Sequence, residues 1–330
     1  MKAMGAVVAT GAVSSVGLTS KDTALSHRAA AAGMREAPLA GPDGEPITMC
    51  FLPVIDPALT GQARAAAIAA RAFAEVLEAL GDVATVAVRA RLYLCVDEPD
   101  PTLRARDLAR FDNVATSLMQ RGSRACPDLS IEVIARGAAS MGFALGPVSN
   151  ALARGDVDLA IVGGVHTDYD PARIAALAES GRLFSPERLD ALIPGEAAAF
   201  VAIVRPDLLR RMGASTELWI HHATTAHEKA RPDNDEPASL AMGMTAALRS
   251  ALSPLAAEGA RAGWMLTDLT FETFRHMELS SAMVRTQKHF CEPQYVDSPA
   301  QRLGYLGAAA MPMHLVLAAE ACKRGFAPYP

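Results

Sequence analysis

The chain is 330 residues long, carries a formal net charge of −5 and is 51% hydrophobic. This length and apolar content suffice for one large domain or for two closely packed halves. The weak acidic balance, without a block of basic residues, argues against a nucleic-acid partner. No apolar run approaches the ~20 residues that a membrane-spanning helix needs.

The number and spacing of the cysteines indicate the redox compartment and whether a metal site is present. There are five, an odd number, and no two of them have a CxxC spacing. This pattern argues against a disulfide framework and a zinc site, and it fits a reducing cytoplasm. His166, Asp168 and Asp170 are close in sequence but form only a local group. We therefore expect no metal, no cofactor and a cytoplasmic protein.

The first half alternates between strand and helix patterns. Residues 4–9 predict a buried strand, and the glycine- and serine-rich residues 10–17 predict the turn after it, rather than a signal peptide. The G-x-G-x-x-G spacing of a dinucleotide site is absent. The next predicted elements are helix 22–33, loop 38–46, strand 47–52, helix 62–80, strand 91–96, loop 97–101, helix 103–120, strand 130–134, helix 141–152 and strand 158–162. This order predicts a mostly parallel sheet covered on both faces.

The rest of the chain repeats the alternation. A short helix and a break at 206–213 predict a boundary between residues 1–212 and 213–330. The predicted elements on either side of it are loop 166–171, helix 172–179, strand 197–204, strand 217–224, loop 226–237, helix 238–252, strand 265–271, short strand 295–297 and a long helix 304–322.

The stretch 128–164 carries the most information about function. It reads as a strand, a turn of small residues at 135–140, a buried helix closed by Arg154-Gly155, and a second buried strand. The first N–H groups of a helix are unpaired and its dipole favours negative charge, so turns of this kind hold nucleophiles or anions in many folds. An ordinary α/β crossover has the same pattern.

This stretch resembles the centre of the β-ketoacyl-ACP synthases, the thiolase-fold condensing enzymes of fatty-acid and polyketide synthesis. The resemblance rests on the run from Ile134 to Ser140, the helix after it, Gly155, and a buried strand that ends in Gly163-Gly164. In that family the turn carries the acyl-accepting cysteine.

The resemblance extends over residues 4–326 and implies an α/β fold. It implies a duplicated thiolase-like arrangement of α-β-α-β-α layers with mixed five-stranded sheets, with residues 1–212 as the first half and 213–330 as the second. The second half is expected to be incomplete, because the family's glycine-rich loop and final strands have no counterpart after residue 325. The resemblance also implies a dimer that pairs through the edge strand at 129–134.

The family's catalytic residues are missing at the matching positions. Gly137 and Ser140 match the flanks of the cysteine, whose own position falls on Ala138. One family histidine falls on Tyr305. The other, from an H-G-T stretch, falls near Glu272, with His276 as the nearest imidazole. The resemblance therefore implies a ketosynthase-like chain in which no catalytic residue is intact.

Further residues are candidates for a pocket. They are Ser140, His166, Asp190, Gly195, Glu196, Arg302 and Gly304. Ser140 is either a nucleophile, for which no base is evident, or a hydroxyl that binds backbone N–H groups at the helix start. His166 lies either at a strand end where α/β sites gather, or in a solvated loop. Gly195 and Glu196 form either a strand-entry turn or a support of the pocket.

Three functions remain open from the sequence. The first is a ketosynthase-like protein without condensing activity, which acts as a partner subunit of an active ketosynthase or binds acyl groups or acyl carrier protein. The second is an acyl-thioester enzyme with a rearranged site at Ser140, His276 or Tyr305. The third is a structural assembly protein. The expected partners are a second copy or an active ketosynthase.

Overall fold

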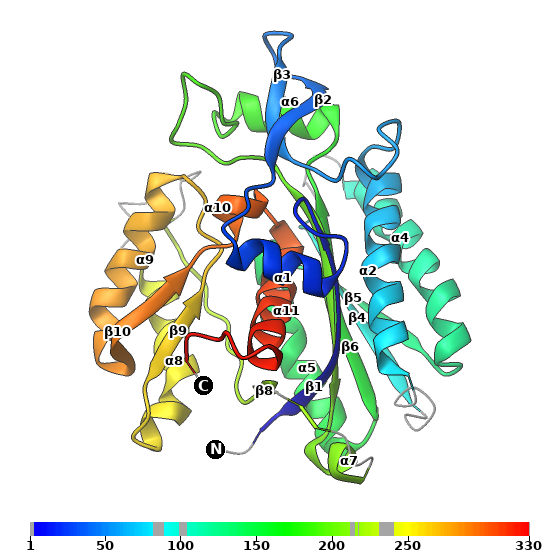
Figure 1. Ribbon diagram of the computed structural model, residues 1–330, viewed down its shortest axis with the longest axis vertical. Coiled ribbons are helices and arrows are strands. Elements are labelled where there is room, and N and C mark those ends of the chain that lie inside the picture. The colour runs from blue at the N-terminus through cyan, green and yellow to red at the C-terminus, as the bar shows by residue number, and fades with distance from the viewer. Residues whose placement is uncertain are drawn as a thin grey trace.

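The computed structural model describes residues 3–81, 89–98, 104–211, 215–216, 218–230 and 241–329, with the backbone only for 104–112. It is a mixed α/β structure in which helices cover both faces of a central sheet (Figure 1). No helix in the described ranges is long and apolar enough to cross a membrane. All five cysteines lie in these ranges and all are free thiols.

The central sheet has six strands and mixed direction. The order across it is β5 (Ser130–Ala135), β4 (Ala90–Val96), β6 (Leu159–Thr167), β7 (Glu196–Val204), β1 (Gly5–Ser14) and β8 (Leu218–Ile220). β5, β4 and β6 are parallel, whereas β7, β1 and β8 each run antiparallel to the preceding strand in that order. β6 and β7 are buried along almost their whole length, as their continuous apolar sequences predict.

Side chains of neighbouring residues point to opposite faces of the sheet, and each face has its own helices. Leu92 and Leu94 of β4 join the core formed with α2 (Gly61–Leu80) and α4 (Arg104–Ala125). Tyr93 and Cys95 join the core formed with α1 (Ser20–Arg28), α5 (Ser140–Arg154) and α11 (Ala310–Lys323). The two cores lie on either side of the sheet in Figure 1. The alternation follows from the two-residue period of a strand.

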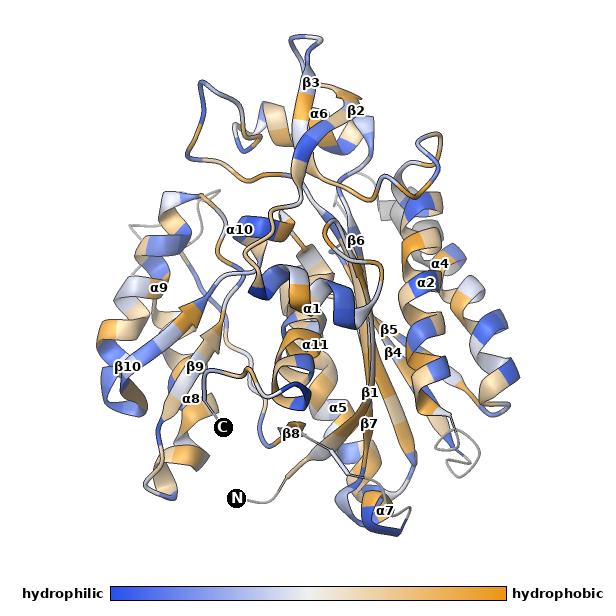
Figure 2. Ribbon diagram, in the orientation of Figure 1, coloured by the Kyte–Doolittle hydropathy of each residue, from blue (hydrophilic) through white to orange (hydrophobic). Residues whose placement is uncertain are grey.

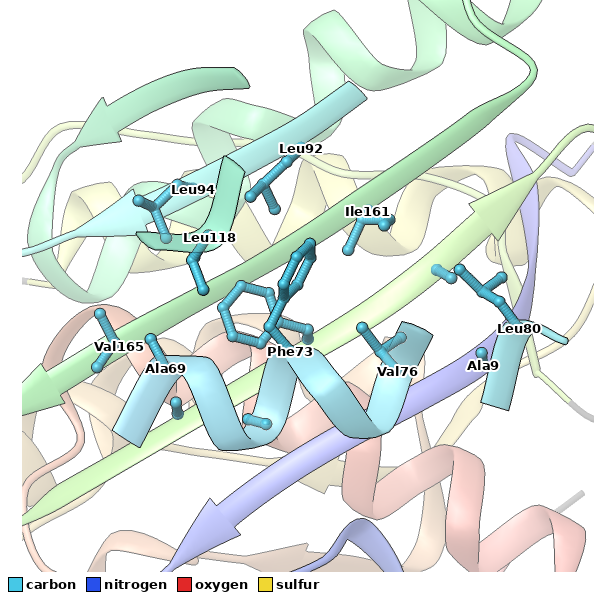
Figure 3. Close-up of a cluster of buried hydrophobic side chains, with 14 of the residues drawn as sticks. Ala9, Ala69, Phe73, Val76, Leu80, Leu92, Leu94, Leu118, Ile161 and Val165 are labelled. Carbon is cyan, nitrogen blue, oxygen red and sulfur yellow. The ribbon is translucent and has the colours of Figure 1, made fainter. Parts of the chain in front are cut away.

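The core under α2 shows why this helix forms where the sequence predicts it. Ile68, Phe73, Val76 and Leu80 recur at helical spacing and are all buried. Figure 3 shows Phe73 and Val76 pointing from the helix toward the sheet, and the Phe73 ring meets the Phe200 ring edge-on, with centroids 5.4 Å apart. Each such side chain contributes about 1.5–3 kcal/mol by leaving water.

A small cap covers one end of the sheet. We use this name for the hairpin of β2 (Met34–Ala40) and β3 (Pro46–Cys50), the helix α6 (Pro171–Glu179) and the loop 180–192. These segments share a separate cluster of buried apolar side chains, which includes Met49, Tyr169 and Leu177. The cap lies at the top of the molecule in Figure 1, beside the carboxyl end of β6.

The second part of the chain forms a smaller layer beside α11. Its elements are α8 (Met242–Ala257), β9 (Ala262–Leu266), α9 (Thr273–Thr286), η2 (Gln287–His289), β10 (Phe290–Asp297) and α10 (Ala300–Leu303). β9 and β10 pair in parallel. The order β9-α9-β10-α11 repeats the order β4-α4-β5-α5 of the first part, so the structure carries an internal duplication.

The duplication is also visible in the sequence. Residues 137–155 and 307–325 align without a gap at a constant offset of 170 residues. The identical pairs are Gly137/Gly307, Ala138/Ala308, Ala139/Ala309, Met141/Met311, Leu145/Leu315, Ala151/Ala321, Arg154/Arg324 and Gly155/Gly325. All four glycines have positive φ, between 43° and 75°. In each copy a 3₁₀ turn, η1 (Gly137–Ala139) or η3 (Gly307–Ala309), precedes the buried helix.

Most predicted elements are confirmed, with the following corrections. The turn expected at 10–17 is strand as far as Ser14, because residues 9–14 continue the antiparallel pairing with β7. The loop expected at 38–46 begins in β2, whose backbone pairs with β3. The strand expected at 217–224 is only β8. The boundary expected at 212–213 lies outside the described residues.

Two corrections concern the second half. The strand expected at 265–271 ends at Leu266, because its partner β10 ends at Asp297, whose carbonyl accepts the last bond between the two segments from the Thr267 N–H. The helix expected at 304–322 begins only at Ala310. Gly304 and Gly307 have φ of 78° and 43°, which a right-handed helix does not contain, and the Tyr305 N–H donates to Ile193 instead.

Candidate functional site

The candidate site lies where β5 runs into α5. Gly137 has φ of 56°, which turns the chain sharply into the 3₁₀ turn η1. Ala138 is half-buried in this turn and presents only a methyl group. A nucleophile at this place would lie at a helix start, where the dipole favours a thiolate. The turn thus leads directly into a buried helix, and the side chain of Ala138 offers no nucleophilic atom.

Ser140 does not act as a free hydroxyl. It is fully buried. Its Oγ donates to the Val96 carbonyl at 3.0 Å and accepts from the Arg136 N–H at 2.9 Å. The hydroxyl thus joins the end of β4 to the turn after β5. This agrees with the structural role that the sequence left open for Ser140.

The nearby thiols are not available as substitutes. Cys95 lies on β4 beneath the turn, and burial raises its pKa to about 12. Cys50 lies at the end of β3, and burial raises its pKa to about 12 as well, against weaker opposing effects of Ser15 and Arg35. A thiol with such a pKa stays protonated at neutral pH, and the thiolate is the nucleophile.

His166 lies at the centre of a buried ionic cluster at the carboxyl end of β6. Its Nδ1 lies 2.6 Å from Asp97 Oδ2, and its Nε2 lies 3.0 Å from Asp168 Oδ2. Burial opposes a charge here, but the two carboxylates outweigh it and raise the pKa of His166 to about 10. Arg173 completes the cluster at 2.9 Å from Asp168. The two carboxylates therefore favour the protonated form of the imidazole.

This position corrects the alternative of a solvated loop histidine. His166 is 2% exposed. It lies within β6, where it pairs with Ala197 of β7, one residue before the end of the strand at Thr167. Asp97 was predicted only as part of the loop 97–101. Its position directly after a buried strand is the sequence feature that could have marked it as a site residue. Burial would raise the pKa of Asp168, but His166 and Arg173 hold it well below its usual value.

Tyr305 occupies the matched histidine position and faces the same cluster. Its ring meets the His166 ring edge-on, with centroids 5.0 Å apart. Burial, followed by the charge of Asp97, raises the pKa of Tyr305 to about 12. Asp97 also accepts a hydrogen bond at 3.0 Å from the Ala308 N–H in the turn η3. One carboxylate thus joins β4, β6 and the start of the second repeat.

The loop after β9 holds carboxylates where the resemblance expects a histidine. Glu272 is buried and pairs with Arg182 of the cap at 2.7 Å and with Arg275 at 3.1 Å. Burial opposes its charge, yet the arginines hold the pKa of Glu272 below its usual value. Asp268 lies closer to the strand end and pairs with Arg275 at 3.2 Å.

The remaining candidates join segments of the chain. His276, in the first turn of α9, donates from Nε2 to the carbonyl of Thr270 in the preceding loop, at 2.8 Å. Asp190 accepts from the Thr273 N–H at 2.6 Å and so holds the cap against the start of α9. Arg302 lies 3.6 Å from Asp297. These side chains are thus used in local contacts.

Glu196 forms a deeply buried ion pair with Arg64. Both its oxygens accept from the Arg64 guanidinium at 2.7 Å. They also accept from the Leu52 N–H at 2.6 Å and from the Thr167 hydroxyl at 2.7 Å. Both side chains are almost completely excluded from solvent. Glu196 is therefore a structural junction of α2, β6 and β7, and not a catalytic acid.

Gly195 and Gly304 are required by a close crossing of two backbones. A Cβ on Gly195 would lie 2.4 Å from the Tyr305 carbonyl oxygen, and one on Gly304 would lie 2.8 Å from the Pro194 carbonyl oxygen. At this crossing Tyr305, from the second half, contacts the segment that follows the cap, and its N–H donates to the Ile193 carbonyl. In the described part of the chain, no group of His, Cys, Asp and Glu could hold a metal ion.

The geometry thus brings together part of the predicted site. His166, Tyr305 and the start of the turn η3 form one cluster with Asp97, Asp168 and Arg173. Ser140 is joined to it through β4. Glu196, Asp190 and Arg302 lie in separate contacts.

No protein-family model matches this chain, and no curated protein matches it. Solved structures do. The ketosynthase from module 6 of the bacillaene synthase of Bacillus subtilis 168 matches with a TM-score of 0.75 and 15% identity, over 96% of this chain and 60% of that one. The chain thus spans less than two thirds of that ketosynthase.

Two further matches cover more of their own chains. The ishigamide ketosynthase/chain length factor matches with a TM-score of 0.75 and 17% identity, over 98% of this chain and 87% of that one. A type II ketosynthase in complex with its acyl-carrier protein, AntDE:AntF, matches with a TM-score of 0.76 and 15% identity, over 97% and 86%. The chain therefore has the thiolase-like α/β fold of the ketosynthases.

Proposed function

We propose that the chain is a ketosynthase-like protein of polyketide or fatty-acid synthesis that does not itself form carbon–carbon bonds. It acts as the partner subunit of an intact ketosynthase and binds acyl chains presented by acyl carrier protein. The observation that carries this proposal is the methyl group of Ala138, which lies at the start of α5 in place of a nucleophile.

The charges around the turn support the same proposal. A condensing enzyme needs hydrogen-bond donors and neutral imidazoles that stabilise developing negative charge. Here His166 is already charged and is held by two carboxylates. Glu272 and Asp268 are neutralised by Arg275. These groups satisfy one another, which favours a fixed structural network over a reactive one.

The edge of the sheet supports a partner subunit. β5 is an edge strand, and Val133 on it is 44% exposed, as is Phe143 of α5 at 45%. An apolar edge strand favours pairing with another chain. Among the structures with this fold are a ketosynthase/chain length factor and a ketosynthase bound to its acyl carrier protein. We infer that β5 is the pairing edge for a ketosynthase with an intact cysteine.

The test of inactivity uses radiolabelled acyl-ACP together with malonyl-ACP. We expect reversible binding of acyl-ACP, no covalent label and no β-ketoacyl product. Covalent label on the wild-type chain that is lost in Ser140→Ala would contradict the proposal and favour a rearranged acyl-transfer enzyme.

The test of the partner uses the tagged chain recovered from the cells that produce it. We expect a co-purifying ketosynthase, identified by mass spectrometry, and loss of that protein in Val133→Glu. Leu189→Glu, at an exposed position of the cap, is the matched control and should retain it. Recovery of the chain with no ketosynthase, or equal recovery with Val133→Glu, would contradict the assignment.

A further inference from the structure

The outer face of α9 carries an apolar stripe that no described part of the chain covers. Met277 is 66% exposed and Val284 is 76% exposed, and Phe274 is exposed on the same side. Ser280 lies between them, and Lys288 follows in the turn after the helix. These positions recur at intervals of three or four residues, which places them on one face. α9 lies at the periphery of the molecule, far from the central sheet (Figure 1).

The stripe is not a general property of outer helices in this fold. α4 is the counterpart of α9 in the first repeat. The exposed positions among its described side chains, 113–125, are all polar or charged: Asn113, Thr116, Gln120, Arg121, Ser123 and Arg124. Along α9, by contrast, the exposed Phe274, Met277 and Val284 are large and apolar, and the ribbon of α9 carries orange, hydrophobic segments in Figure 2. Contiguous exposed apolar surface of this kind marks interaction sites.

The two ends of the stripe carry opposite charge. At the N-terminal end the exposed Asp190 accepts from the Thr273 N–H, and Leu189 beside it is 65% exposed. At the C-terminal end Lys288 is exposed, and so is Arg249, whose guanidinium reaches the Arg285 carbonyl from α8. Each end also holds a side chain of the other sign, Arg182 paired with Glu272 at the first and Glu292 bonded to Gln287 at the second. The stripe therefore runs from the exposed carboxylate of Asp190, across an apolar centre, to the exposed cations of Lys288 and Arg249.

We propose that α9 pairs antiparallel with α9 of a second copy of this chain. An isologous two-fold contact requires a self-complementary patch. Antiparallel pairing places the acidic end around Asp190 of one copy beside the basic end around Lys288 of the other. It also places the apolar centres together, and the small Ser280 near the two-fold axis lets the helices approach. The opposed helix dipoles favour the same orientation.

The length of the apolar stripe determines the affinity that we expect for the α9–α9 pairing. Positions 274–288 extend over roughly 21 Å at the rise of an α-helix. One helix face of that length buries an area at the low end of specific interfaces, so the pairing is reversible and depends on concentration. It is separate from the β5 edge and does not rest on the proposed function. Where β5 is occupied by another subunit, α9 would join two such pairs.

Analytical ultracentrifugation of the purified chain tests the surface. We expect the weight-average mass to rise with concentration, and Met277→Glu or Val284→Glu to halve the mass reached by the wild type. Both side chains are too exposed for these changes to unfold the chain, which circular dichroism checks. Val133→Glu on β5 and Leu25→Glu on α1 are the controls and should leave the α9 association intact.

A charge cycle tests the antiparallel geometry. Lys288→Glu should weaken the association at least tenfold, because the new carboxylate faces Asp190 of the other copy. Asp190→Asn keeps the oxygen that accepts from Thr273 and removes the charge, so it should recover most of that loss in the Lys288→Glu background. A monomer at all concentrations, an unchanged mass for Met277→Glu and Val284→Glu, or no recovery in the double variant would overturn the proposal.

Discussion

At the scale of single residues, the buried charges are the most constrained feature of this chain. Arg64 and Glu196 form a bidentate pair without solvent, and His166 lies between Asp97 and Asp168. Taking charges out of water is costly, so each must be matched by hydrogen bonds as well as by its partner. Arg64 and Glu196 are matched in both ways, whereas His166 Nε2 lies 3.0 Å from Asp168 without the geometry of a hydrogen bond. Residues that look catalytic in the sequence are thus used in structural contacts.

The Arg64–Glu196 pair gives the first prediction. Glu196→Gln leaves the buried guanidinium without its counter-charge and should lower the free energy of unfolding by about 3–5 kcal/mol. Urea denaturation at neutral pH measures this change. Asp156→Asn is the control, because it removes an exposed pair with Arg154 and should cost less than about 1 kcal/mol. Similar small losses for the two variants would show that Glu196 has no such role.

The sequence could not predict the partners of these buried charged residues. Glu196 and Asp190 were candidates because of their place in a family-like segment, but their partners Arg64 and Thr273 lie far away in sequence. The burial of His166 depended on Asp97, 69 residues earlier. Ala138 and Tyr305, by contrast, were matched to family positions because each lies within a short motif, and the catalytic meaning of those positions stays a prediction.

At the scale of elements, the two repeated turns η1 and η3 connect the preceding segments to the buried helices α5 and α11. η1 and η3 each bend a chain into a buried helix, and each uses a glycine at positive φ. In η3 that glycine also lies against the ionic cluster. A Cβ on Gly307 would lie 2.3 Å from His166 Nδ1 and 2.5 Å from Asp97 Oδ1.

Gly307 gives the second prediction. Gly307→Ala must strain the backbone and also displace the His166–Asp97 pair, so it should destabilise the chain by more than the roughly 1–2 kcal/mol that positive φ alone costs. Gly325→Ala is the matched control, since Gly325 has φ of 68° and open space around it. Thermal unfolding of the two variants compares them. An equal loss for both would mean that the cluster tolerates the methyl group.

The internal repeat could have been found in the sequence, and it was missed. The identities between residues 137–155 and 307–325 need no gap, but they lie in alanine-rich segments where chance matches are frequent. The strands and helices of the first half were predicted well because long amphipathic or apolar runs determine them. β8 and β9 were predicted too long, because their ends depend on contacts with other segments.

At the scale of the whole molecule, the fold is the one that the resemblance implied, with β8 added to the five strands of the first part. Its stability should depend on pH through two histidines of opposite behaviour, the half-buried His314 and the buried His166. Burial lowers the pKa of His314, on α11, to about 4, with Asp268, His27 and Asp297 as its charged neighbours. The carboxylates around His166 raise its pKa to about 10.

These shifts give the third prediction. Below pH 6.5 His314 binds a proton in the unfolded chain but stays neutral in the folded chain. The free energy of unfolding should therefore fall as the pH drops from 6.5 toward 4. The stabilisation by His166 is complete below pH 6.5 and should be lost as the pH rises toward 10. Urea denaturation across this range should show a maximum near pH 6.5. His314→Leu should flatten only the acidic side, and an unchanged acidic slope would contradict this assignment.

The most direct test of the central claim restores the missing nucleophile. Wild type and Ala138→Cys are incubated with acyl-ACP, and intact-mass spectrometry measures transfer of the acyl group to the chain. The account predicts no adduct on the wild type and a single adduct on residue 138 of the variant, because the helix start at η1 still favours a thiolate. An adduct on the wild type would contradict the claim that the chain lacks a nucleophile, and an inert Ala138→Cys would contradict the claim that the turn keeps the geometry of one.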